Sequence, residues 1–176
     1  MLAKIEAVLI ADQSATFVSR AIDKVDLRFG GIEGDRHFGV TAKANVRQPM
    51  YPKGSEIMNR RQLSIVSVEE LQLIAERLGV DEIKPEWLGA NILISGYPEL
   101  TKLPLGIRML LPNGGGLVCE GENEPCTGPG KQIANHYGRK ELTHEFVKLA
   151  RQLRGIVAYV ERPGELKSGD QVEIQL

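Results

Sequence analysis

Short apolar segments separated by glycine turns recur along most of this 176-residue chain, and no other feature constrains the fold as strongly. Segments of this length, with apolar residues alternating or in short runs, are typical of β-strands. The expected strand regions are 3–11, 16–29, 61–67, 89–95, 106–111, 116–121 and 155–176. The pattern predicts a mainly β fold, a closed or nearly closed β-barrel with a few peripheral helices, because closure removes exposed strand edges.

One helix is clearly marked between Ser67 and Gly79. Ser67, followed three residues later by Glu70, has the pattern of a capping box, and Gly79 stands where a helix-ending glycine belongs. Apolar residues recur between them at helical spacing. A second helical pair is expected at about 131–137 and 144–153. Glycine-containing turns are expected at 113–116, 163–164 and 168–170.

The charge balance argues against a polyanionic partner. Lys and Arg number 22 and Asp and Glu 23, a net charge of −1, whereas proteins that bind nucleic acid or anionic membranes usually carry a basic face. A local basic pocket for a phosphate is compatible with this balance. With no long apolar run and only two cysteines, the sequence predicts a single cytoplasmic domain over residues 1–176 with reduced thiols.

Cys126 lies in "GENEPCTGPGKQ", residues 121–132, the stretch with the most chemical content. An accessible thiolate is both a nucleophile and a metal ligand. The Gly-Pro-Gly run that follows predicts an irregular turn open to a substrate. Lys131 and the start of the next helix would stabilise a thiolate, whereas three upstream glutamates would oppose it. From these residues alone, a working thiol and an inert loop cysteine both remain open.

Cys119 has a different setting, because it lies within an alternating strand pattern. A small buried core residue is expected there. The two cysteines with His136 and His144 have the spacing C-x6-C-x9-H-x7-H, which differs from the short clips of structural zinc sites. A zinc site is therefore not expected.

Residues 30–51 predict a long ordered loop, and long loops in compact domains are usually functional. Its "GGIEGDRHFG" stretch contains Gly34, Asp35 and Arg36, which can form an anion nest with a guanidinium aimed at a phosphate. The alternative is a solvated loop in which Asp35 pairs with Arg36. "NRRQ" at 59–62 is expected to be a solvated strand edge.

Taken together, these stretches resemble a MOSC domain, the module named for the C-terminal part of molybdenum cofactor sulfurases. The resemblance runs through most of the chain. Its motifs are "GGIEGDRHFG", "RQLSIVSVEEL", "WLGANILISG", "LPLGIRMLL", "GENEPCTGPG" and "RGIVAYVERPGELKSGDQVEI". It implies a strand-rich barrel, and it places the family's characteristic functional cysteine at Cys126.

The resemblance also implies a cofactor pocket. Arg36 matches a position that faces the pterin and its phosphate in cofactor-binding members, and Asn91 matches an asparagine that lines the same pocket. Gly34 and Asp35 are grouped with them as cofactor-binding residues. Two further residues of the same motifs, Asn123 and Arg154, receive no role.

Three functions are compatible with this resemblance. In the first, Cys126 ligates molybdenum of a molybdopterin cofactor, and the protein reduces N-hydroxylated small-molecule substrates with electrons from a donor protein. In the second, Cys126 is a sulfur carrier that accepts a sulfur atom from a cysteine desulfurase and holds it as a persulfide for molybdenum cofactor or metal-sulfur assembly. In the third, the barrel binds a ligand or partner without catalysis.

The chain differs from larger members of the family in two respects. It has no aminotransferase-like domain, so no pyridoxal phosphate is expected. It also lacks the additional N-terminal β domain that encloses the cofactor in longer reductases. A molybdenum cofactor would therefore be bound in a more open site and lost more easily on purification.

Overall fold

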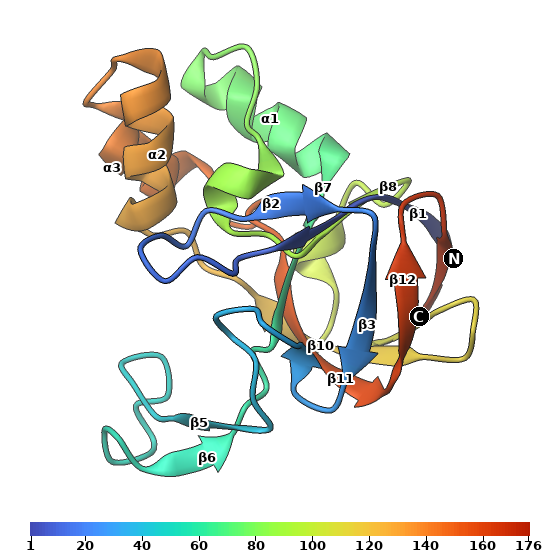
Figure 1. The fold of residues 1–176 in the computed structure, drawn as a ribbon. Coiled ribbons are helices and arrows are strands. Elements are labelled where there is room, and N and C mark those ends of the chain that lie inside the picture. Colours follow the sequence, from blue (N-terminus) through green and yellow to red (C-terminus); the bar gives the residue numbers. More distant parts are fainter.

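Seven strands close into a barrel in the computed structural model, which describes residues 1–176 (Figure 1). Around the barrel the order is β13-β9-β10-β11-β7-β8-β1, and β13 pairs with β1 to close it. All neighbours are antiparallel except β7 and β8. Their bounds are β1 Leu2–Ile10, β7 Leu63–Ser67, β8 Ile92–Ser95, β9 Arg108–Leu110, β10 Gly116–Glu122, β11 Ile156–Arg162 and β13 Gln171–Gln175. The closed barrel confirms the expected fold class.

A cluster of 23 buried residues, almost all aliphatic, fills the barrel and continues beneath the short strands beside it. Strand β13 shows why the alternating pattern gives this core: Val172 and Ile174 are buried, and the residues between and beside them are exposed. Successive side chains of a strand point to opposite faces, so one face fills the barrel and the other meets solvent. Cys119 belongs to this interior cluster, as its sequence setting predicted.

Shorter strands lie outside the barrel. Strand β2 (Arg20–Ile22) extends the sheet beside β1, and a separate three-stranded sheet has the order β12-β3-β4. Its strands are β3 Lys24–Arg28, β4 Gly31–Ile32 and β12 Gly164–Lys167. A two-stranded hairpin, β5 Thr41–Lys43 with β6 Glu56–Met58, projects from the body at the lower left of Figure 1. The long ordered loop expected over 30–51 is present for most of its length, but strands β4 and β5 interrupt it, and they are too short to show alternation in the sequence.

Three helices cover one end of the barrel, with 14 further buried residues between them and the strands (Figure 1). They are α1 Val68–Leu78, α2 Thr127–Tyr137 and α3 Leu142–Leu149, with two short 3-10 turns, η1 Pro85–Leu88 and η2 Leu100–Lys102. Helix α1 begins and ends as expected: the Ser67 hydroxyl accepts from the Glu70 N–H at 3.2 Å, and Gly79 has a φ of 61°. None of the helices has the length and hydropathy to cross a membrane.

Candidate functional site

Cys126 occupies the N-cap position of helix α2, with an extended backbone (φ −137°, ψ 172°) and an exposed side chain. The sequence predicted an irregular turn after the cysteine and a helix beginning near Lys131, and this was wrong. Proline is tolerated in the first turn of a helix because the N–H groups there have no partner within the helix. The thiol therefore lies directly at the positive end of the α2 dipole, not one turn away from it.

Gly130 has a packing role in this first turn. A Cβ atom at Gly130 would overlap the carbonyl of Thr143, at the start of α3. Only glycine lets α2 lie this close to α3, while Pro129 is buried on the same turn. The Gly-Pro-Gly run thus sets the position of Cys126 by helix packing.

Beside Cys126 is a cavity of about 210 Å³. Four arginines line it, at positions 36, 47, 61 and 154 of the sequence. The lining residues are Phe17, Arg36, His37, Arg47, Arg61, Leu63, Ser64, Leu88, Gly89, Asn123, Cys126, Gly128, Pro129, Arg154 and Val157. No carboxylate lines the cavity, and none of its arginines forms an ion pair, although the chain has nine Lys or Arg ion pairs elsewhere. Positive charge is therefore concentrated in the cavity.

Arg154 is the most buried of the four, with 5% of its surface exposed. Its Nη1 donates to the Ser64 hydroxyl at 3.2 Å and its Nη2 to the Leu88 carbonyl at 2.7 Å, but its Nε–H has no partner. Burial lowers the pKa of Arg154 to about 10. The negative charge of a Cys126 thiolate raises this pKa, and the positive charges of Arg61 and Arg47 lower it further. A buried cation with an unsatisfied donor beside a cavity is an arrangement that an anion would complete.

Arg61 is half-buried and adds a second strong donor. Its Nη2 donates to the Asn123 side-chain oxygen at 3.1 Å. Burial, followed by the positive charge of Arg47, lowers the pKa of Arg61. The neighbouring Arg60 behaves differently, since it forms an exposed ion pair with Glu120 at 2.8 Å. The expectation that both arginines form a solvated edge therefore holds for Arg60 and was wrong for Arg61.

Asp35 and Asn91 lie behind the cavity and support it. The Asp35 carboxylate accepts from the backbone N–H of Ala11, the Asn91 amide, and the backbone N–H and ring of His37, at 2.8–3.0 Å. Burial acts to raise the pKa of Asp35, but these hydrogen bonds outweigh it and hold the pKa below its usual value. Asn91 is fully buried and accepts from the Ser64 N–H at 3.0 Å. Neither side chain lines the cavity.

The loop that contains Gly34 and Arg36 does not form an anion nest. The backbone N–H groups of Asp35 and Arg36 donate to the carbonyls of Ile32 and Ala11, so they are unavailable to a ligand. The alternative of a solvated Asp35–Arg36 pair is also wrong, because Asp35 is buried and pairs with His37. Gly34, with φ 88°, makes the turn. Arg36 and His37 line the cavity, whereas Gly34 and Asp35 do not.

The sequence therefore identified Cys126 and Arg36 as site residues. It did not identify the other three arginines of the cavity, Arg47, Arg61 and Arg154. Arg47 carries no local pattern that would mark it, and Arg154 was noted without a role. The constraint beside Arg154 is visible only in the structure: Gly155 has a φ of 87°, and its missing Cβ makes room for the Ile65 carbonyl.

The chain is similar to known proteins along its whole length. It is 51% identical over 175 residues, 99% of this chain and 91% of the relative, to YuaD of Bacillus subtilis (strain 168), whose name provisionally assigns it to metal-sulfur cluster biosynthesis. The crystal structure of YuaD superposes with a TM-score of 0.95, covering 99% of this chain and 96% of that one. The fold alone is shared with YiiM of Geobacillus stearothermophilus, at 12% identity and a TM-score of 0.65, covering 99% of this chain and 75% of that one.

A comparison with protein families matches the MOSC domain over residues 33–173. This match covers most of the chain and contains all seven barrel strands except β1 and the last residues of β13. It agrees with the resemblance that the sequence motifs carry. The chain belongs to the MOSC domain family.

Proposed function

We propose that this protein is a sulfur carrier in which Cys126 holds a transferable sulfur atom as a persulfide. The single observation that carries the proposal is the placement of an exposed thiol at the N-cap of α2, on the rim of a cavity lined by four unpaired arginines. The helix end and the guanidinium groups surround the sulfur with positive charge. The name of the relative YuaD, which refers to metal-sulfur cluster biosynthesis, supports sulfur chemistry in the same way.

The loading step needs no external oxidant. The Cys126 thiolate attacks the outer sulfur of a donor persulfide, R–S–SH, and the S–S bond of the donor breaks. The donor leaves as the thiolate R–S⁻, and Cys126 becomes Cys126–S–SH, so that one sulfur atom and its proton move together. The arginine cavity then has a defined task, which is to hold an anionic acceptor beside the loaded cysteine.

Reaction with glutathione persulfide, followed by intact mass spectrometry, tests this function. Wild type and Cys119→Ser are expected to gain about 32 Da, one sulfur atom, and Cys126→Ser is expected to stay unmodified. The Cys119→Ser variant is a matched control because Cys119 is buried in the barrel, where burial raises the pKa of its thiol. Absence of the added mass in wild type would refute the carrier function.

A second candidate is binding of a molybdenum cofactor, and the charge of the cavity favours it. The residues fit the group: Arg36, Arg47, Arg61 and Arg154 would hold its phosphate, and the soft thiolate of Cys126 would ligate molybdenum. The bound cofactor would supply oxygen-atom transfer, the chemistry required to reduce N-hydroxylated substrates. In this function the protein would also need a separate electron donor.

Molybdenum and pterin content separates the two candidates. Protein from a host with abundant molybdenum cofactor is compared with Cys126→Ser and Arg154→Met prepared in parallel. Molybdenum near one atom per chain in wild type, and its loss in both variants, would establish the cofactor function. Molybdenum absent from wild type, together with sulfur loading of Cys126, would establish the carrier function alone.

A further inference from the structure

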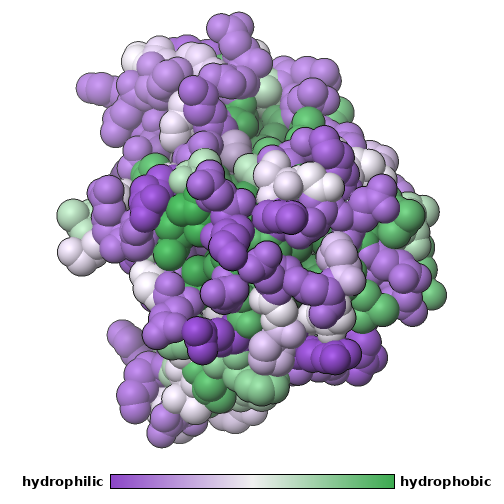
Figure 2. Space-filling model, turned by 45° about the vertical axis from the view of Figure 1, so that its right-hand side comes forward, coloured by the Kyte–Doolittle hydropathy of each residue, from purple (hydrophilic) through white to green (hydrophobic).

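The segment from residue 38 to residue 58, here called the arm, leaves the barrel and carries an unusual amount of exposed apolar surface. Val46 is 87% exposed and Met50 71%, and the other large apolar residues of the arm follow the same pattern: Phe38, Val40, Tyr51 and Met58 are also exposed. Hydrophobic surface gathers at the lower end of the molecule in Figure 2, where the arm projects. Contiguous apolar surface of this kind marks interaction sites.

The arm is held in shape by its own hydrogen bonds. At its base the Asn59 amide donates to the carbonyls of His37 and Gly39, at 2.8 and 3.0 Å. Near its tip Asn45 and Gln48 bond to each other, with the Asn45 N–H donating to the Gln48 side chain at 3.2 Å and the Gln48 N–H to the Asn45 carbonyl at 3.0 Å. A surface ordered in this way is available to a partner without a large entropic cost of folding on binding.

A groove of about 660 Å³ runs between the arm and the barrel. Arg36, His37, Arg47 and Arg61 line both this groove and the cavity beside Cys126, so the two spaces adjoin. A molecule bound in the groove therefore lies close to the cavity that contains the thiol.

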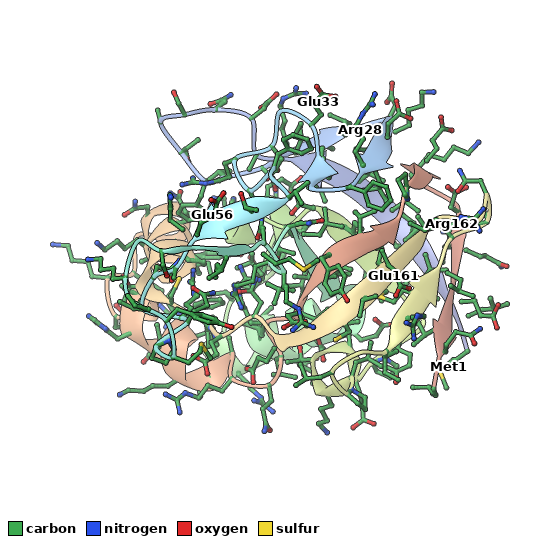
Figure 3. The ribbon with its side chains drawn as sticks, turned by 90° about the horizontal axis from the view of Figure 1, so that it is seen from below. Met1, Arg28, Glu33, Glu56, Glu161 and Arg162 are labelled. Atoms are coloured by element: carbon green, nitrogen blue, oxygen red, sulfur yellow. The ribbon has the colours of Figure 1, made fainter.

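The groove is basic as well as apolar. The arm contains the cations Lys43, Arg47 and Lys53 and one acid, Glu56, whose carboxylate accepts from the Thr41 hydroxyl across the hairpin at 2.7 Å. Glu56 lies on β6 in the view from below in Figure 3. On the barrel side the single acid of the groove, Glu120, is paired with Arg60. The local charge is clearly positive in a chain whose net charge is −1.

We infer that the arm is the docking surface for the sulfur donor, a protein that presents an acidic and apolar segment next to its own cysteine persulfide. This inference rests on the proposed carrier function and names its partner. The acidic side chains of the segment pair with Lys43, Arg47 and Lys53, and its apolar side chains cover Val46 and Met50. Nucleic acid fits the site less well, because phosphate contacts would leave the apolar arm uncovered.

Docking places the donor persulfide at the end of the groove, beside Cys126. There the Cys126 thiolate takes the outer sulfur, the donor S–S bond breaks, and the donor cysteine departs as a thiolate. Glutathione persulfide performs the same chemistry without a docking segment, so it reports on the thiol alone. Comparing the two donors isolates the contribution of the arm.

The experiment measures sulfur transfer to full-length protein from a bacterial cysteine desulfurase charged with 35S-cysteine, and from glutathione persulfide. Two arm variants are used, Val46→Ser/Met50→Ser and Lys43→Glu/Lys53→Glu, which change exposed residues and leave the Cys126 cavity intact. The matched controls are Leu2→Ser, 58% exposed on the barrel, and the charge reversal of exposed Lys140 to Glu. Circular dichroism verifies that all variants fold.

We expect transfer from the desulfurase to fall by at least about tenfold in both arm variants, as for loss of interfacial anchors, with the controls and the glutathione persulfide rates unchanged. Transfer from the desulfurase at the wild-type rate in both arm variants would overturn the docking inference and leave the carrier function standing. Wild type that accepts sulfur from glutathione persulfide but not from the desulfurase would overturn it as well. Failure with both donors would refute the carrier function itself.

Discussion

Arg154 and Cys126 face the same cavity, the first buried and the second exposed, and a Cys126 thiolate is the anion whose charge stabilises the Arg154 cation. The partners that Arg154 contacts directly, the Ser64 hydroxyl and the Leu88 carbonyl, are neutral. A buried cation in this setting costs free energy unless an anion is bound. The thiol and the cation that would bind an anion therefore belong to one site.

Inorganic phosphate should stabilise the protein through this cavity. A ligand that binds only the folded state at 100 times its Kd raises the free energy of unfolding by about 2.7 kcal/mol. We expect a rise in Tm with phosphate at constant ionic strength, measured by thermal unfolding. Arg154→Met and Arg61→Met should weaken phosphate binding by about tenfold or more.

Arg60→Met is the matched control for this measurement, because Arg60 adjoins Arg61 but pairs with Glu120 outside the cavity. It should retain the phosphate effect. Equal stabilisation of wild type, Arg61→Met and Arg154→Met would show that phosphate acts elsewhere on the protein.

Replacement of Asp35 by Asn should destabilise the fold by about 3 kcal/mol, since the carboxylate is buried and accepts hydrogen bonds from Ala11, His37 and Asn91. The folded-state pKa lies below the ordinary value of 3.8, so this stability is present above pH 3.8 and is lost as the pH falls further. Urea unfolding at pH 7 and below pH 3.8 checks both statements.

Asp12→Asn is the control, because Asp12 is paired with Arg20 at the exposed surface and its replacement should change stability little. A difference between wild type and Asp35→Asn that does not shrink at low pH would contradict the role given to the charge.

The buried carboxyl of Glu70 should make the free energy of unfolding depend on pH in the opposite direction. Its carboxyl is buried and accepts from the N–H and hydroxyl of Thr101, both at 2.8 Å, yet burial outweighs these bonds and raises its pKa from 4.5 to about 7. The protonated form is therefore favoured in the folded state, and the stability it contributes is present below pH 4.5 and lost as the pH rises through 7. Between pH 4.5 and a pH above 7, the free energy of unfolding of wild type should fall by about 3 kcal/mol relative to that of Glu70→Gln, as measured by urea unfolding. Parallel pH profiles of the two proteins would contradict the raised pKa.

Gly130→Ala should destabilise the protein by about 2 kcal/mol, the cost of overpacking a close contact, because the new methyl group would overlap the Thr143 carbonyl. Gly116→Ala is a suitable control, since a Cβ there meets its neighbours at 3.9 Å, an ordinary contact distance. Chemical unfolding of both variants measures the difference. Equal stabilities would mean that α2 and α3 can separate without cost, and that Gly130 does not fix the position of Cys126.

The barrel and helix α1 could be predicted because their signals are local. Alternation along β13 and the cap at Ser67 depend on residues close in sequence, and both elements lie where they were expected. The start of α2 was mistaken because glycine and proline are common in turns, while here proline sits in a first helical turn and Gly130 is required by a neighbouring helix.

The cavity could be predicted only in part, for a physical reason. Arg47, Arg61 and Arg154 are brought together by closure of the barrel and by the fold of the arm, and no sequence pattern relates them. The expected roles of Arg36 and Asn91 rested on family resemblance. The structure puts Arg36 at the cavity and Asn91 behind it, joined to Ser64.

Peptide mass spectrometry of wild-type protein, after reaction with one equivalent of glutathione persulfide and alkylation, locates the added sulfur directly. We expect about 32 Da on the peptide that contains Cys126 and none on the peptide that contains Cys119, because only Cys126 is exposed. Sulfur on neither peptide, or on both equally, would contradict the assignment of Cys126 as the carrier.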